Sequence, residues 1–176
     1  MIFVALLNSW RKFMKNRIKI GLIASGGGHL EELRWIRGLE KKYNYFYLTE
    51  RGGFDDAGYI KHAYFVEKIN RKEKFFFIHF FKLILYSFRI LLKEKPDVLI
   101  STGALVAVPI LYLGKLFGKK IIFIETIARI ESLSLTGKLI YPIADCFIVQ
   151  WEELQQKYPK IVYASGIFGK HRENEG

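Results

Sequence analysis

The sequence predicts an α/β protein built on a parallel β-sheet with helices on both faces. Short, nearly continuous apolar runs alternate along the chain with longer segments of helical periodicity. Strands that are apolar throughout are buried on both faces, as in parallel sheets with helical crossovers. The 176 residues, 51% of them hydrophobic, supply one ordinary core. We therefore expect a single Rossmann-like domain.

The first half of the chain supplies three expected strands and one helix. Ile18–Ala24 is an apolar run that stops at a glycine cluster, and Leu30, Leu33 and Leu39 recur after it at helical spacing. Glycines and aspartates at 52–56 mark a loop. The expected elements are strands over Ile18–Ala24, Tyr45–Thr49 and Ala63–Glu67 and a helix over 29–42.

The second half continues the alternation and contains no linker or internal repeat. The expected strands are Val98–Ser101, Ile121–Glu125, Cys146–Gln150 and Val162–Ser165, and the expected helices are 75–93, 104–117 and 152–157, with a loop and short helix over 126–143. We expect the domain to span 18–168, between an amphipathic helix at 1–17 and a flexible tail at 169–176.

Composition excludes several classes of protein. A single cysteine, Cys146, rules out a disulfide framework and a cysteine-built zinc site, and the four histidines lack metal-ligand spacing. The net charge is +11, with +5 in residues 1–20 and +6 in residues 68–95. Both segments are also apolar, which favours an anionic membrane surface, although solvated basic faces are the alternative. No nucleic-acid-binding module is present, so we expect no nucleic-acid partner.

Two segments are candidates for membrane contact. In a helix over 1–17, one face carries Phe3, Leu6, Leu7 and Trp10, and the opposite face carries basic residues that include Lys12. In the helix over 75–93, the candidates are Phe76, Phe77, Phe80 and Phe81, whereas His79, Lys82, Tyr86, Arg89 and Lys93 form one narrow polar stripe. Packing on the protein's own core, or on a partner, remains the alternative for each.

Parallel sheets of this kind place their sites beyond the carboxyl ends of the strands. Ser25, Gly26, Gly27, Gly28 and His29 follow the first strand. The glycines permit close approach of a ligand, and the following helix offers free N–H groups, which suits a phosphate or pyrophosphate. The spacing matches neither a P-loop nor a dinucleotide fingerprint. His29 is either a proton acceptor or a structural cap.

Two further loops belong to this predicted edge. Thr102 and Gly103 follow the strand at 98–101, and Glu125 follows an apolar run. Glu125 either binds a hydroxylated ligand or forms a structural ion pair with Arg129. No Asp-x-Asp metal-chelating motif is present, so we expect the chemistry at this edge to be metal-independent, with no cofactor.

Several motifs, in order from about 18 to 168, carry a family resemblance. They are Ser25–Leu30, Pro96–Gly103, Glu125–Arg129, Ser134–Pro142, Phe147–Glu153 and Tyr158-Pro159. The chain resembles the acceptor-binding subunit of the two-part N-acetylglucosaminyltransferase of dolichol-linked oligosaccharide assembly. It resembles more closely the bacterial relatives in capsular and exopolysaccharide synthesis. Gly26 departs from the serine that is frequent in relatives, and we expect the short amphipathic start to take the place of the transmembrane anchor of eukaryotic members.

The resemblance implies the N-terminal half of a GT-B glycosyltransferase, with the UDP-sugar held mainly by a separate small subunit. It further implies that Ser25–His29 hold the pyrophosphate of a polyprenyl-linked saccharide, with Thr102, Gly103 and Arg129 nearby. Glu125 would contact the acceptor sugar or the donor. We expect an inverting transferase of hexose or hexuronic acid, peripheral on the cytoplasmic face of the cell membrane. The alternatives are a non-catalytic enhancer and anchor of a partner enzyme, and a phosphate-binding module unrelated to sugars.

Overall fold

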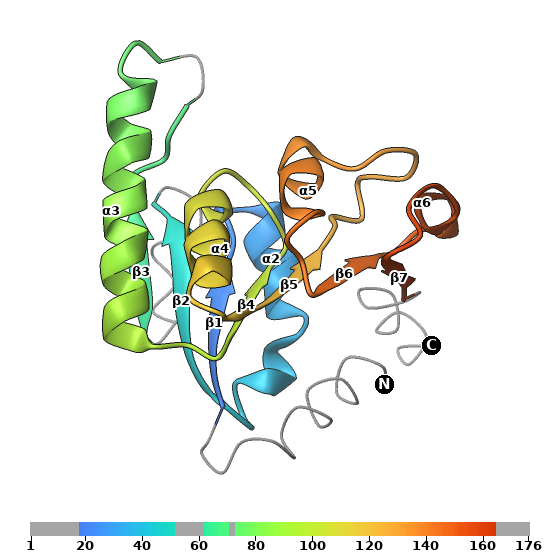
Figure 1. Ribbon diagram of the computed structural model, residues 1–176, viewed down its shortest axis with the longest axis horizontal. Helices are drawn as coiled ribbons and strands as arrows, with labels where there is room; N and C mark the ends of the chain where they lie inside the picture. The colour runs from blue at the N-terminus through green and yellow to red at the C-terminus, as the bar shows by residue number, and fades with distance from the viewer. Residues whose placement is uncertain (1–17, 52–61, 71–72, 165–176) are drawn as a thin grey trace, which may run out of the picture.

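The computed structural model describes residues 18–51, 62–70 and 73–164, which form one α/β unit (Figure 1). Within these residues, seven parallel strands lie in the order β3-β2-β1-β4-β5-β6-β7. The strands are β1 (Lys19–Ile23), β2 (Asn44–Glu50), β3 (Ala63–Val66), β4 (Val98–Ser101), β5 (Lys120–Ile124), β6 (Cys146–Val149) and β7 (Ile161–Tyr163). The predicted parallel sheet is confirmed.

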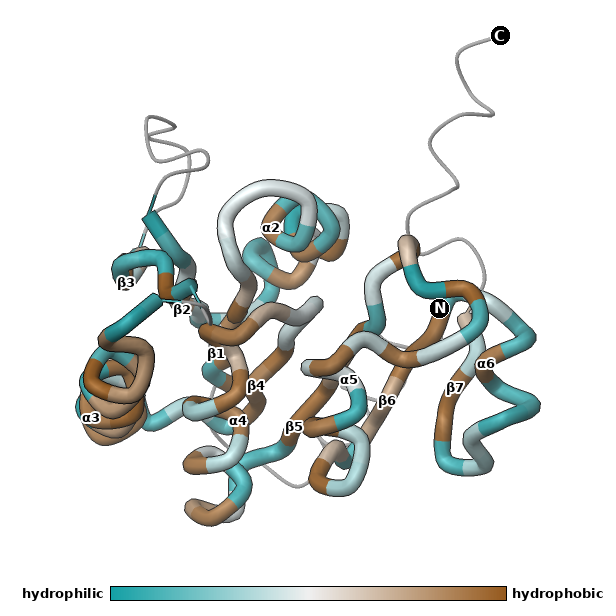
Figure 2. Tube along the Cα trace, turned by 90° about the horizontal axis from the view of Figure 1, so that it is seen from above, coloured by the Kyte–Doolittle hydropathy of each residue, from teal (hydrophilic) through white to brown (hydrophobic). Residues whose placement is uncertain are grey.

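Helices cover both faces of this sheet (Figure 2). The helices are α2 (Gly28–Arg34), α3 (Phe76–Glu94), α4 (Ala107–Leu116), α5 (Leu135–Ile140) and α6 (Glu152–Lys157), with a 3₁₀ turn, η1, at Arg37–Leu39. One face packs against α2 and η1, and the other packs against α3, α4, α5 and α6. The prediction of a sheet buried on both sides is therefore also confirmed.

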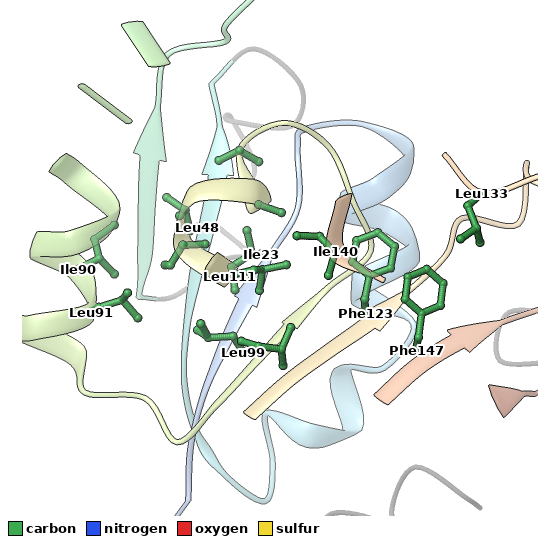
Figure 3. Close-up of a cluster of buried hydrophobic side chains, with 14 of the residues drawn as sticks. Ile23, Leu48, Ile90, Leu91, Leu99, Leu111, Phe123, Leu133, Ile140 and Phe147 are labelled. Atoms are coloured by element: carbon green, nitrogen blue, oxygen red, sulfur yellow. The ribbon is translucent and has the colours of Figure 1, made fainter. Parts of the chain in front are cut away.

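Alternation along each strand divides the core into two layers. On β4, Leu99 faces one layer whereas Val98 and Ile100 face the other. The larger layer, with Leu99, Phe123 and Phe147, lies beneath α3, α4 and α5 (Figure 3). Helix α4 lies so close to the sheet that a Cβ added at Gly114 would stand 2.3 Å from Leu99 Cδ1. These strands are apolar throughout because both of their faces are covered.

Two helix predictions need correction. The helix expected over 29–42 ends at Arg34, and bonds from Ile36 N to Leu33 O and from Leu39 N to Ile36 O tighten the chain into η1. This turn carries Leu39 into the core beside Leu33. The helix expected from residue 104 begins at Ala107, because Ala104 has a φ of 72°, which no right-handed helix accommodates.

Strand ends shift by one residue in several places. Glu125 and Gln150 lie just beyond β5 and β6 instead of within them, and the last strand is Ile161–Tyr163. The expected amphipathic helix at 1–17 and the expected tail at 169–176 lie outside the described residues.

Candidate functional site

The predicted site lies at the point where the strand order reverses. β1 and β4 are neighbours in the sheet, and the chain leaves β1 toward one face and β4 toward the other. The loops that follow the two strands touch: Thr102 Oγ1 donates a hydrogen bond of 2.7 Å to His29 O. A Cβ added at Gly103 would lie 3.2 Å from His29 Cε1. The structure thus brings His29, Thr102 and Gly103 together.

The glycine loop leaves free space beside this contact. Gly27 precedes α2 with a φ of 83°, and a Cβ added at Gly27 or Gly28 would meet no atom within 4 Å. Ser25 and Gly26 are half-buried in the same loop. The loop therefore has room for a ligand on its outer side, as the pyrophosphate prediction requires.

The loop after β4 has unusual backbone geometry. Gly103 has a φ of 129° and Ala104 has a φ of 72°, so two consecutive residues lie on the positive side of the Ramachandran map. Ser101 Oγ accepts a hydrogen bond of 3.0 Å from Gly103 N, which holds the turn. Backbone strain of this kind concentrates at ligand-binding positions.

His29 has a carboxylate neighbour that the sequence analysis missed. Glu32 Oε2 lies 3.6 Å from His29 Nδ1, and neither of these buried atoms has a hydrogen-bond partner. The other carboxylate oxygen, Glu32 Oε1, accepts from Thr126 Oγ1 at 2.6 Å and from Ile127 N at 3.2 Å. The sequence does contain an indication of this pair, because residues three positions apart lie on the same face of a helix. This carboxylate lies where it can orient the imidazole ring.

Glu125 is buried, with 1% of its surface exposed, and its carboxylate is occupied. Oε1 accepts from Thr126 N at 3.1 Å, and Oε2 accepts from Ser134 N at 3.0 Å and from Ser134 Oγ at 3.2 Å. Burial raises the pKa of Glu125, against the opposing effects of these hydrogen bonds and of His29. Arg129 is exposed, and among the described residues no ion pair joins it to Glu125.

Two of the motifs that carry the family resemblance, Ser134–Pro142 and Phe147–Glu153, hold this carboxylate and its loop. Ser134 caps α5 by accepting from Gly137 N at 2.9 Å, and a Cβ added at Gly137 would stand 2.1 Å from Glu125 Oε2. Gln150 Nε2 donates to Glu125 O at 3.1 Å, and Trp151 Nε1 donates to Ile127 O at 2.7 Å. These motifs therefore fix the backbone over residues 125–137.

Glu50, at the carboxyl end of β2, is a further titratable group at this edge that the sequence analysis did not single out. Burial raises its pKa, against the opposing effects of Lys68 and His29. An isolated glutamate at a strand end carries no pattern that would have identified it. Its carboxylate interacts electrostatically with His29, which makes it part of the site's charge balance.

Helix α3 presents a large apolar surface (Figure 2). Of the predicted membrane residues, Phe77 and Phe81 are 82% and 59% exposed, whereas Phe76 stacks on Phe80, which packs against the core. Core contacts come from the opposite face, through Leu83, Ser87, Ile90 and Leu91. In the described part of the chain no helix combines the length and apolarity needed to cross a membrane. Phe3, Leu6, Leu7, Trp10 and Lys12 lie outside the described residues.

Comparisons with known proteins agree with this fold. Residues 20–168 match the family described as "Oligosaccharide biosynthesis protein Alg14 like". The human UDP-N-acetylglucosamine transferase subunit ALG14 is 32% identical over 187 residues, covering 87% of this chain and 84% of the relative. The mouse subunit of the same name is 46% identical over 88 residues, and this match spans 47% of the chain and only 41% of the mouse protein.

Solved structures share the fold at low sequence identity. MurG from Acinetobacter baumannii has a TM-score of 0.69 at 16% identity, covering 85% of this chain and 46% of MurG. UDP-N-acetylglucosamine 2-epimerase from Rickettsia bellii has a TM-score of 0.67 at 18% identity, covering 86% of this chain and 46% of the epimerase. The chain thus corresponds to about half of each, which confirms the predicted N-terminal half of a GT-B-type fold.

Proposed function

The chain belongs to the family of Alg14-like oligosaccharide biosynthesis proteins, and from this premise we propose that it is the acceptor-binding subunit of a two-component glycosyltransferase. A small partner subunit would hold most of the UDP-sugar, and this chain would hold a saccharide linked to polyprenyl pyrophosphate. The observation that carries the proposal is the cluster of His29, Glu32 and the glycine loop at the strand-order reversal.

The proposed chemistry is direct displacement with inversion. The acceptor hydroxyl oxygen attacks the anomeric carbon of the donor, the bond from that carbon to the UDP oxygen breaks, and UDP leaves. The hydroxyl proton passes to Nε2 of His29, while Glu32 near Nδ1 stabilises the imidazolium. The phosphates of the acceptor lie against Ser25–Gly28, where the backbone leaves open space.

Glu125 and Arg129 have different roles in this proposal. The observed partners of Glu125 fit a positioning role, in which it shapes the loop that carries Thr126 and Ile127 to Glu32. Arg129 is exposed on the same loop and is available to an anionic part of the substrate. Thr102 and Gly103 fix the position of the His29 backbone and ring.

We place the protein peripherally on the cytoplasmic face of the cell membrane. The exposed phenylalanines of α3 and the basic residues of the segment 68–95 support this placement, because apolar area and cationic charge add in binding to anionic bilayers. The metabolic setting we propose is capsular or exopolysaccharide synthesis. The relatives are named as UDP-N-acetylglucosamine transferase subunits, and the proposed setting allows other sugars. The identity of the donor sugar is therefore the first part of the proposal to test.

The test is transfer of labelled sugar to membrane lipid, with this chain alone, the partner alone and both together. The donors are UDP-N-acetylglucosamine, UDP-glucose, UDP-galactose and UDP-glucuronic acid. We expect transfer only with both subunits and from one donor. The variant His29→Asn should abolish transfer without affecting assembly, and His62→Asn is the matched control, because Asn tolerates the φ of 59° at residue 62. Full activity of His29→Asn would refute the assigned base.

A non-catalytic enhancer is the second candidate, because the carboxylate of Glu125 is fully occupied by its own loop and leaves His29 as the catalytic group on which the enzyme reading depends. In that case the partner alone transfers sugar, this chain only raises the rate, and His29→Asn lowers the affinity for the acceptor while kcat stays unchanged.

A further inference from the structure

A groove of about 560 Å³ lies between α3 and the segment that follows β3. Sites that hold small organic ligands typically measure roughly 300–1,000 Å³. The apolar side chains that line the groove come from both elements: Phe65, Val66, Ile69, Leu83 and Leu85. The chemistry proposed above makes no use of this groove.

The polar stripe of α3 lines the same groove. Its members recur every three or four residues and therefore lie along one side of the helix. Those that line the groove are His79, Lys82, Tyr86 and Arg89. From the opposite wall comes Lys68. The stripe, which the sequence left without a role, thus faces a ligand-sized hollow and not only solvent.

Positive charge exceeds negative charge in the groove. Its two carboxylates each have a basic partner: Glu73 lies 2.8 Å from His79, and Glu67 lies 3.5 Å from Arg51. The three cations Lys68, Lys82 and Arg89 form no ion pair with any described residue. Apolar walls with surplus cations fit an amphipathic anion.

One end of the groove adjoins the candidate site. Val66, which lines the groove, is paired in register with Glu50 at the end of β2, and β2 pairs in turn with β1, whose carboxyl end carries the glycine loop. The exposed apolar residues Phe77, Ile78 and Phe81 lie on the same helix that forms one wall. An occupant of the groove would therefore contact α3 along one side and reach the sheet edge that carries the glycine loop.

We propose that this groove holds the polyprenyl chain of the acceptor next to its phosphates, with Lys68 at the junction between chain and phosphate. The inference rests on the proposed function, since it assigns a place to the lipid part of the same acceptor. Lys82 and Arg89 would line the path of the chain with their apolar stems and carry their charges at the rim.

A matched pair of variants on α3 tests the groove. Leu85 lines it and is 45% exposed, whereas Leu92 is on the same helix, is 53% exposed and is not among the lining residues. Leu85→Trp should fill the groove, and Leu92→Trp should add the same bulk outside it. Ile69→Trp fills the groove from the opposite wall and covers the case in which Leu85→Trp fails to fold, as read by circular dichroism.

The first measurement is binding of farnesyl diphosphate to the purified two-subunit complex by titration calorimetry. We expect the Kd to rise at least tenfold in Leu85→Trp and to stay unchanged in Leu92→Trp. Inorganic pyrophosphate should bind more weakly than farnesyl diphosphate and respond to neither variant. Equal binding of farnesyl diphosphate by wild type and Leu85→Trp would overturn the proposal. A loss of binding in Leu85→Trp that is seen only with phosphatidylglycerol vesicles would also overturn the proposal, because the groove would then bind bulk lipid.

The second measurement separates the groove from the proposed function. With a long-chain acceptor, Leu85→Trp should raise KM at least tenfold and leave kcat unchanged, whereas a short-chain acceptor should show no difference. Absence of transfer by the wild-type complex would refute the function, while the farnesyl diphosphate titration would still test the groove. Unchanged KM in Leu85→Trp with the long-chain acceptor would refute the groove and leave the function intact. Loss of partner binding in Leu85→Trp would assign the groove to the partner.

Discussion

The two halves of the carboxyl edge differ in how far the chain satisfies its own polar groups. Around β5 and β6, three hydrogen bonds occupy the carboxylate of Glu125, and Gln150 binds its backbone carbonyl. Around β1 and β4, His29 Nδ1 and Glu32 Oε2 are buried and have no hydrogen-bond partner. These two atoms approach each other only to 3.6 Å, next to the open space of the glycine loop, so this half of the edge is the less completely bonded of the two.

This difference separates two kinds of residue that the sequence could not tell apart. A carboxylate at a strand tip and a histidine after a glycine loop both suggest chemistry. Only the histidine keeps unused hydrogen-bonding capacity beside open space. The β5–β6 half is a scaffold, and the β1–β4 half is the reactive part. The predictions below test that division.

The largest effect is expected from Gly137→Ala in the scaffold. The new methyl group would stand 2.1 Å from Glu125 Oε2 and force the buried carboxylate away from Ser134. We expect the free energy of unfolding to fall by about 3 kcal/mol, despite the higher helix propensity of alanine. Urea denaturation of Gly137→Ala and of the wild-type protein measures this difference in the free energy of unfolding.

Gly38→Ala is the control, because a Cβ at Gly38 meets no atom within 4 Å. We expect it to change stability by no more than about 0.5 kcal/mol. The double variant Glu125→Ala/Gly137→Ala should lose less than the sum of the two single losses. Equal losses for Gly137→Ala and Gly38→Ala would mean that the carboxylate is not held as described.

A smaller loss of stability, with a large loss of activity, is expected from Gly103→Ala in the reactive half. A φ of 129° is unfavourable for alanine, and the methyl group would press on the His29 ring at 3.2 Å. We expect about 2 kcal/mol less stability and a drop of at least tenfold in kcat of the two-subunit complex. Normal kcat with reduced stability would show that the position of the His29 ring does not matter for transfer.

Thr102→Val tests the hydrogen bond that joins the two loops. Valine keeps the shape and loses the 2.7 Å bond to His29 O, so we expect a loss of about 1 kcal/mol. Thr49→Val is a matched control, because Thr49 Oγ1 is buried with no partner and its removal should be neutral or stabilising. Urea denaturation of both variants measures their free energies of unfolding. Equal changes in Thr102→Val and Thr49→Val would contradict the hydrogen bond from Thr102 to His29 O.

Local patterns predicted the strands, the sheet type and the loops at its carboxyl edge. The i, i+3 spacing of His29 and Glu32 is present in the sequence, but the hydrogen bond from Thr126 that holds Glu32 spans 94 positions and appears only in the folded chain. Gly137 belongs to a motif that carries the family resemblance, but the reason that glycine stands there is its close approach to Glu125, which appears only in the folded chain. The start of α4 was wrong by three residues, since nothing in the sequence indicates a positive φ at Ala104.

The smallest effect, and the one that compares the halves most directly, comes from the two buried carboxyls. The pKa of Glu50 and that of Glu125 are both raised above 4.5 by burial, so each binds a proton more readily in the folded state. Each therefore makes the folded protein less stable as pH rises from about 4.5 through the folded pKa.

Glu50→Gln removes that titration without breaking a hydrogen bond from any described residue. We expect the variant to be more stable than wild type at pH 7.5, with the difference closing below pH 4.5. Glu125→Gln removes a similar titration but places an amide N–H₂ against the N–H donors of Thr126 and Ser134, so we expect a net loss at pH 7.5. Urea denaturation at the two pH values measures both. A gain in Glu125→Gln would mean that its hydrogen bonds do not outweigh its burial, and the division between scaffold and reactive half would then fail at its central residue.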